Sequence, residues 1–160
     1  MEKEYTKIIA YLLSDGGLSI EGEMGLYMYL RSMDKALLED FEKSLASFRL
    51  KPYRKFYRRA FQSKVGSKEV SRKLLAMCNT FRTLKCEHSP TCSVIRGTGR
   101  QPCLKCVYPG QKESLVELPI FVTENKGNIA EFLKVFASTE GHVRYDPKRK
   151  TRRMIIGCAH

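Results

Sequence analysis

Apolar residues along this chain recur first at the spacing of a helix and then at that of strands. The segment 8–13 carries its apolar side chains on one helical face and ends at Asp15, Gly16 and Gly17. Alternating apolar positions at 18–20 and 24–30 then predict two strands around a glycine turn. A helix is expected at 34–48, with Asp34 near its start. The chain therefore opens as helix, strand pair, helix.

The next segment, 51–65, interleaves aromatic and basic residues. It predicts a two-stranded ribbon that could enter a DNA major groove, or else an exposed basic sheet edge that only resists aggregation. Ser67 is then positioned to begin a further helix. The candidate DNA-binding residues of this ribbon are Lys51, Arg54, Lys55, Arg58, Arg59 and Lys64.

The opening pattern returns near the end of the chain. A second apolar helix, expected to begin at Asn128, ends in Glu140 and Gly141, and a strand-like segment follows it. A turn at Asp146-Pro147 then leads into a strand at 152–157. Its basic residues suit contacts with phosphates, and the DNA-binding candidates here are Arg144, Lys148, Arg149, Lys150, Arg152 and Arg153.

Both helices end in an acidic residue followed by glycine. In the first, Ala10 and Ser14 are four residues apart, so one face carries small side chains and another helix could pack closely against it. Gly16 and Gly17 are expected to stop this helix through a left-handed cap. Asp15 would then lie at the negative end of the helix dipole, which favours a cation nearby.

The two segments resemble the signature of the LAGLIDADG homing endonucleases. Residues 8–16 match its nine positions, with Asp15 at the final acid, and residues 133–141 match them again, with Glu140 at that acid. The second copy has Val135 and Thr139 where the family usually has smaller residues.

The resemblance implies an α+β fold, with an αββαββα repeat around a saddle-shaped antiparallel sheet. The first repeat would occupy residues 1–85, and 128–160 would hold the helix and β-hairpin that begin a second. The implied activity is cleavage of both strands of a DNA target. Asp15 and Glu140 would bind Mg²⁺ or Mn²⁺, with the main chain of Gly16 and Gly141 close to the same ions. Lys64 is the candidate for a basic residue near the scissile phosphate.

The distribution of charge supports a polyanionic partner. Residues 1–45 hold five Lys/Arg against nine Asp/Glu, whereas residues 46–160 hold twenty-four against eight. Double-stranded DNA is the simplest partner for so basic a segment, and a solvated basic face without a partner is the alternative. No segment is apolar enough to predict a membrane span, and no signal peptide is evident, so a cytoplasmic, intracellular protein is expected.

Four cysteines interrupt the pattern within residues 86–110, which we interpret as an insertion, with a linker at 111–127. Reduced thiolates at this spacing can hold one structural Zn²⁺; His88 is an alternative to the second ligand, and two disulfides or free thiols are alternatives to zinc. The candidate ligands are Cys86, Cys92, Cys103 and Cys106.

Three functions are compatible with these features: a metal-dependent DNA endonuclease or one subunit of it, a non-cleaving nucleic-acid binder on the same scaffold (a transcription regulator or intron-splicing maturase), and a zinc-stabilised RNA or protein adaptor. Because the second repeat looks incomplete, a second chain is expected to complete it, a complementary subunit in preference to a second copy; a fragment of a longer chain is the third alternative. Without it, the side chains expected to stay exposed are Val135, Phe136, Ile155 and Ile156.

Overall fold

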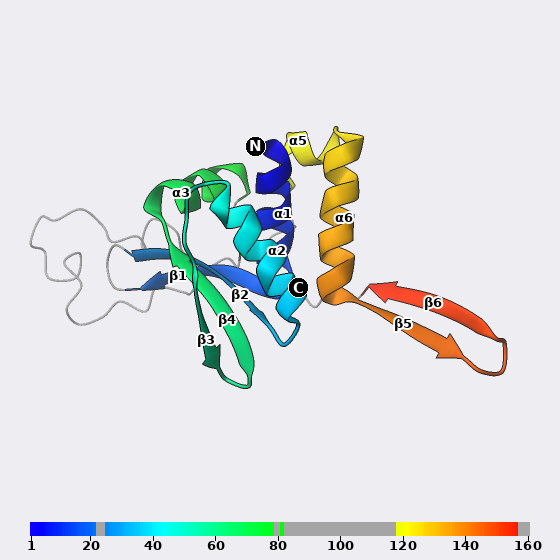
Figure 1. The fold of residues 1–160 in the computed structure, drawn as a ribbon. Coiled ribbons are helices and arrows are strands. Elements are labelled where there is room, and N and C mark those ends of the chain that lie inside the picture. The colour runs from blue at the N-terminus through cyan, green and yellow to red at the C-terminus, as the bar shows by residue number, and fades with distance from the viewer. Residues whose placement is uncertain (22–24, 79–80, 82–117, 157–160) are drawn as a thin grey trace, which may run out of the picture.

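The computed structural model describes residues 1–21, 25–78, 81 and 118–156. The four candidate zinc ligands, the whole 86–110 insertion and the first part of the 111–127 linker lie outside this range. Two groups of elements are described, one before and one after that gap (Figure 1).

The first group has the expected order of helix, two strands, helix, two strands, helix. Its four strands are all antiparallel and are ordered β1-β2-β4-β3 across the sheet. The α+β class is therefore confirmed. The elements are α1 Glu2–Leu13, β1 Gly16–Glu21, β2 Gly25–Ser32, α2 Lys35–Ala46, β3 Tyr53–Tyr57, β4 Ala60–Gly66 and α3 Lys68–Met77.

The sheet has one face covered by helices, as Figure 1 shows. Along β2, Leu26, Met28 and Leu30 point into the core and are at most 1% exposed. Met28 lies opposite Val65 of β4, which is also buried. Burying alternate side chains of central strands under helices removes a large apolar area from water. The other face of the sheet consequently carries the residues between them, which are mostly polar or aromatic.

Helix starts follow the sequence in two cases and differ in a third. Asp34 and Ser67 cap α2 and α3 by accepting hydrogen bonds from the main chain, as their residue types predict. The helix α6, however, is capped by Asn125, whose side chain accepts from two main-chain N–H groups. The predicted start at Asn128 is wrong because the Asn128 side chain instead donates to the Phe121 carbonyl and is buried.

The second group begins within the predicted linker and lies beside the first. Helix α6 runs alongside α1 in the same direction, and the β5–β6 hairpin extends from its end, away from the four-stranded sheet (Figure 1). The β5–β6 pair forms a separate antiparallel sheet. Its elements are α5 Ile120–Thr123, α6 Lys126–Glu140, β5 Gly141–Asp146 and β6 Thr151–Ile156.

The two groups repeat one local arrangement 125 residues apart. Strands β1 and β5 begin at Gly16 and Gly141 and are each six residues long. At the ends of the helices, the hydroxyl of Ser14 donates to the carbonyls of Ala10 and Tyr11. The Thr139 hydroxyl donates to the equivalent carbonyls of the second helix. The structure therefore shows the duplication that the sequence predicts at these helix ends.

The glycines after the helices are required for a reason that differs from the prediction. None of the described glycines has the positive φ of a left-handed cap, and Gly141 is extended, with φ −88° and ψ 146°. A Cβ on Gly16 would instead lie 2.5 Å from the Tyr11 carbonyl oxygen and 2.7 Å from that of Tyr29. A Cβ on Gly141 would lie 2.2 Å from the Ala137 oxygen. Close backbone approach, rather than helix capping, excludes a side chain.

Within the described part of the chain, no helix is long and apolar enough to cross a membrane.

We predict that Gly16→Ala and Gly141→Ala each lower the free energy of unfolding by about 1–3 kcal/mol, because the backbone must move to admit the methyl group. Urea unfolding measures this. Gly127→Ala is the matched control, since its Cβ meets only the Asn125 side chain, at 3.2 Å. Equal effects at all three positions would contradict the steric explanation.

Candidate functional site

The packing of α1 against α6 brings the two acidic residues together. Ala10 and Ser14 of α1 are buried, as is Val135 of α6, which was wrongly expected to be exposed. An ion pair between Lys3 and Glu131, 3.3 Å apart, links the same two helices nearer their starts. Because the helices run in the same direction, their C-terminal ends lie side by side (Figure 1).

Asp15 lies in the turn between α1 and β1, and Glu140 is the last residue of α6. The Asp15 side chain is exposed, yet its surroundings remove enough water that partial burial raises the pKa of its carboxyl group, and the negative charge of Glu140 raises this pKa further. The helix dipoles add negative potential at the same place. A second negative charge and poor solvation are both relieved by a cation.

The carboxylate oxygens of Asp15 and Glu140 are ligands of the kind that a hard divalent cation prefers. Among the residues that the structure describes, no cluster of three or more His, Cys, Asp or Glu side chains could hold a metal ion. The pair would therefore supply only part of a coordination shell. Mg²⁺ suits such a site because it commonly keeps several waters and takes one or two carboxylates together with phosphate oxygens.

A nearby carboxylate, Asp40 of α2, is occupied by structural contacts. It accepts from the Lys7 ammonium at 2.6 Å and from the Tyr11 hydroxyl at 2.8 Å. Burial opposes ionisation, but these hydrogen bonds prevail and lower the pKa of Asp40. Burial and the same carboxylate raise the pKa of Tyr11. These contacts fix α1 against α2. Asp15 and Glu140, at the ends of α1 and α6, have no such ion pair among the described residues.

Some of the predicted DNA-binding residues in and beside the β3–β4 hairpin are exposed to solvent, whereas others form contacts within the protein. Lys51, Lys55, Arg58 and Arg59 are exposed, and Arg58 and Arg59 form the two-residue turn, with φ 48° and 66°. Arg54 points to the helix side of the sheet, where its guanidinium forms two hydrogen bonds with Glu42, of 3.0 and 2.8 Å. This bidentate pair raises the pKa of Arg54 and holds the hairpin against α2.

Lys64 is not brought to the acidic pair. Its side chain is buried on the open face of the sheet, forms an ion pair with Glu21, and lies 4.4 Å from the centre of the Tyr27 ring. Glu21 is at the far end of β1 from Asp15, so the ammonium is directed away from the acids. The structure gives no support to its predicted catalytic position.

The second hairpin presents an exposed basic tip. Lys148, Arg149 and Lys150 occupy the turn and Arg152 follows it, all four exposed. Asp146, the one acid there, accepts from the main-chain N–H groups of Lys148 and Arg149 at 3.0 and 3.2 Å, so it shapes the turn. The side chains of Arg144 and Arg153 lie outside the described part.

Sequence reasoning missed the open face of the four-stranded sheet. Tyr27, Tyr29 and Arg31 alternate with the core residues of β2, and the register places Gln62 of β4 opposite Arg31. The alternation that identified the core also identified this face, because the intervening side chains must point the other way. Here Gly17, Gly25 and Gly66 leave room for tyrosine rings against the backbone; a Cβ on each would lie 2.8 Å from one.

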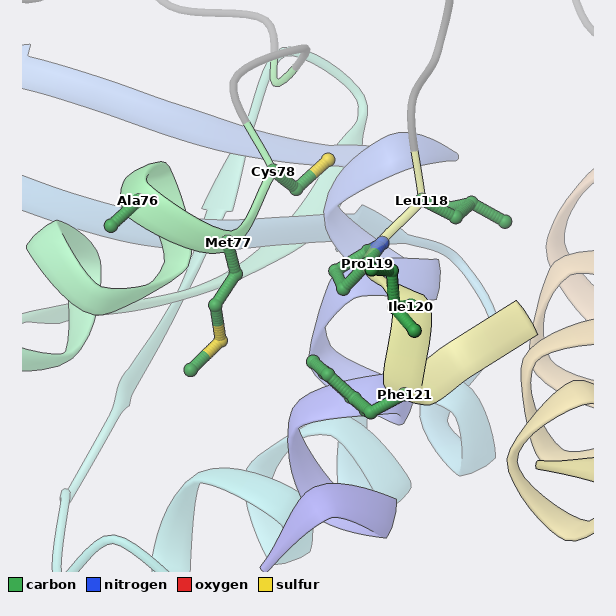
Figure 2. Close-up of a pocket in the computed structure, with 7 residues that line it drawn as sticks. All are labelled: Ala76, Met77, Cys78, Leu118, Pro119, Ile120 and Phe121. Carbon is green, nitrogen blue, oxygen red and sulfur yellow. The ribbon is translucent and has the colours of Figure 1, made fainter. Parts of the chain in front are cut away.

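The structure also contains a pocket of about 420 Å³ between α3 and α5 (Figure 2). Its lining is mainly apolar, and it adjoins both ends of the gap in the described chain at Cys78 and Leu118. None of its described lining residues is an acid or base suited to hydrolysis, so the acidic pair remains the candidate reactive site. The lining residues are Ala76, Met77, Cys78, Leu118, Pro119, Ile120 and Phe121.

A scan of the chain against models of known protein families found no match. A search among curated proteins also found no match.

We predict that the acidic pair makes the metal-free protein less stable as the pH rises. The folded pKa of Asp15 is raised above its unfolded value of about 3.9, so the folded state binds the proton more tightly. The stabilisation is complete below the unfolded pKa and is lost as the pH rises through the folded one. Its size should be below about 1 kcal/mol because the carboxylate is exposed.

Urea unfolding in EDTA between pH 4 and 7 should therefore show a shallower decline for Glu140→Gln than for the unmodified protein. Glu124→Gln, at an exposed acid outside this pair, is the control. An Asp15 carboxyl pKa that is unchanged by Glu140→Gln, measured by NMR titration, would exclude the coupling.

Proposed function

We propose that this chain is a site-specific, divalent-metal-dependent endonuclease acting on double-stranded DNA, or one subunit of it. The observation that carries the proposal is the convergence of Asp15 and Glu140 at the ends of two helices, with a basic hairpin on each side (Figure 1). A purely structural role does not account for the pair, because its repulsion disfavours folding. The two LAGLIDADG-like segments of the sequence support the same function.

In this proposal the carboxylates of Asp15 and Glu140 hold Mg²⁺ or Mn²⁺, and the small residues Gly16 and Gly141 let the main chain come close. A bound ion of this kind activates water and stabilises the oxygen that leaves a phosphodiester. The protein positions the two acids through the α1–α6 packing, and the hairpins hold the DNA backbone over them. Since Lys64 is turned toward Glu21, it is left out of the catalytic group.

The hairpins supply the affinity for DNA. Exposed lysines and arginines release counterions from phosphates on binding, so the affinity should fall steeply with salt. The described side chains available for this are Lys51, Lys55, Arg58, Arg59, Lys148, Arg149, Lys150 and Arg152. An intracellular location, where DNA is found, accompanies this function.

One observation favours a second candidate, a non-cleaving DNA-binding protein on the same scaffold. Lys64, the basic residue expected beside the reacting phosphate, is engaged elsewhere, and none of the other described cations forms an ion pair with Asp15 or Glu140. A binder would retain the basic hairpins and lack cleavage in any metal. The cleavage experiment below separates the two candidates.

We also propose that another polypeptide covers the second group of elements. Equivalent positions differ sharply in burial: Leu133 is 52% exposed, whereas Ile8, 125 residues earlier, is 0% exposed. Ile156 is 45% exposed, whereas Leu30, which occupies the same register position in the first hairpin, is 0% exposed. In the first group α2 packs against both α1 and β2, and β4 pairs with β2. A helix and strand pair of the same apolar character is the partner that fits.

We expect the active particle to exceed the 18.4 kDa of this chain, as measured by light scattering with mass spectrometry. Leu133→Glu should weaken the association, because it places a charge in the buried interface. Met33→Glu, at another exposed apolar residue, is the control. A cleavage-competent monomer of 18.4 kDa would exclude the partner.

Structural Zn²⁺ held by Cys86, Cys92, Cys103 and Cys106 is part of the proposal, on the basis of their spacing alone. Elemental analysis should find about one zinc per chain, lost in Cys103→Ser.

We predict that Asp15→Asn and Glu140→Gln abolish DNA cleavage while changing DNA affinity less than about threefold, because affinity comes from the hairpins. Cleavage of randomised duplexes is measured with Mg²⁺, with Mn²⁺ and with EDTA, and affinity is measured in Ca²⁺. Glu124→Gln should cleave normally. Undiminished cleavage by Asp15→Asn would exclude the metal site, and tight binding without cleavage by the unmodified protein would select the second candidate.

A further inference from the structure

Three cations surround one aromatic ring on the open face of the sheet. The Tyr57 ring centre lies 4.8 Å from the guanidinium of Arg31, 5.3 Å from the ammonium of Lys55 and 5.2 Å from the guanidinium of Arg58. No described carboxylate forms an ion pair with any of the three. The ring stabilises each cation, but their mutual repulsion remains. Such a cluster fits a ligand that is rich in hydrogen-bond acceptors.

Arg31 is the least exposed of these cations, since it is half-buried whereas Lys55 and Arg58 are exposed. Its guanidinium packs against two rings, that of Tyr57 and that of Tyr29, 5.3 Å away. Its Nε is buried and has no hydrogen-bond partner. A cation held by aromatic rings in place of a carboxylate keeps its terminal N–H groups available, and its fixed position lowers the entropy cost of using them.

Whether a cation lies on a central strand or an edge strand of the sheet determines which part of the DNA it can contact. Arg31 is on β2 and its register partner Gln62 is on β4, the two central strands, whereas Lys55 is on the edge strand β3. Strand spacings of about 4.8 Å make the sheet about 14 Å wide, slightly more than a major groove of about 12 Å. If the sheet lies over the groove, its central strands would face base edges and its edge strands would lie over the phosphates that border the groove.

We infer that Arg31 is the residue of this face that reads a guanine, by donating to the O6 and N7 acceptors in the major groove, while Lys55 contacts phosphate. The inference rests on the proposed binding of double-stranded DNA. Guanine is favoured over phosphate for Arg31 because the side chain stands on a central strand, and because arginine matches both guanine acceptors at once.

The test compares two cations that share the Tyr57 ring. Binding sites are selected from randomised duplexes in Ca²⁺ with the unmodified protein, Arg31→Gln and Lys55→Gln. The unmodified protein should require one guanine that Arg31→Gln no longer requires, with a loss of about 5- to 150-fold on the original site and little loss on sites lacking that guanine. Lys55→Gln should weaken all sequences alike and reduce the salt dependence.

A second measurement needs no variant and so is independent of the folding of Arg31→Gln. Placing 7-deazaguanine at the required position removes the N7 acceptor and should weaken binding by the unmodified protein; methylphosphonates at the flanking phosphates test the other contact. If Arg31→Gln weakens binding to all sequences equally and the guanine is still required, Arg31 contacts phosphate and the assignment to guanine is wrong. If the protein binds duplex DNA without requiring any guanine, the assignment of Arg31 to guanine is wrong but the proposed function stands. If the protein binds no duplex DNA, both are wrong.

Discussion

The structure depends on α1 having no solvent-exposed face over its second half. The six consecutive residues 8–13 are each at most 4% exposed, because the helix is enclosed by α2, the sheet and α6. An amphipathic helix against one layer would leave a polar face outward. Here a second layer is necessary, and α6 supplies it. The proximity of Asp15 and Glu140 therefore follows from the apolar character of α1, since covering that helix places the end of α6 beside its own end.

The same constraint explains which polar groups are tolerated in the core. Tyr11 is 1% exposed, and its hydroxyl is compensated by Asp40, which Lys7 neutralises in turn. The Ser14 hydroxyl donates a hydrogen bond to the Ala10 carbonyl of its own helix. The buried hydroxyls of Tyr11 and Ser14 thus each have a partner, as burial demands. The acids at the end lack such compensation, and this contrast separates the candidate site from the scaffold.

Much of the fold was accessible from local sequence, because its determinants are local. Alternation identified the β1–β2 hairpin, and Asp34 and Ser67 cap their helices through their own side chains. The start of α6 was misplaced because Asn125 and Asn128 are equally good caps by residue type, and only the Phe121 carbonyl decides between them. The duplicated helix ends, and hence the acidic pair, were evident because the two copies agree.

What local sequence could not supply was the direction of individual basic side chains. Within one hairpin Arg54 turns to Glu42, Lys64 to Glu21, and Lys55 to an open face, although all three are basic residues of β-strands. The outcomes for Arg54 and Lys64 depend on which acid a distant element places nearby, whereas the rings beside Lys55 are on its own strand. The glycines were likewise recognised as necessary but for the wrong reason, because contacts with the carbonyls of Tyr29 and Ala137 exist only after folding.

The turn between β3 and β4 carries an implication about selection. Arg58 and Arg59 both have positive φ, a conformation in which Asn-Gly is the common pair and larger residues are strained. Two adjacent arginines in this turn make the protein less stable than an Asn-Gly pair with the same turn geometry would. Proteins commonly retain such concessions where a side chain is needed for activity. The hairpin tip therefore keeps two positive charges at a cost in stability that an Asn-Gly turn would avoid.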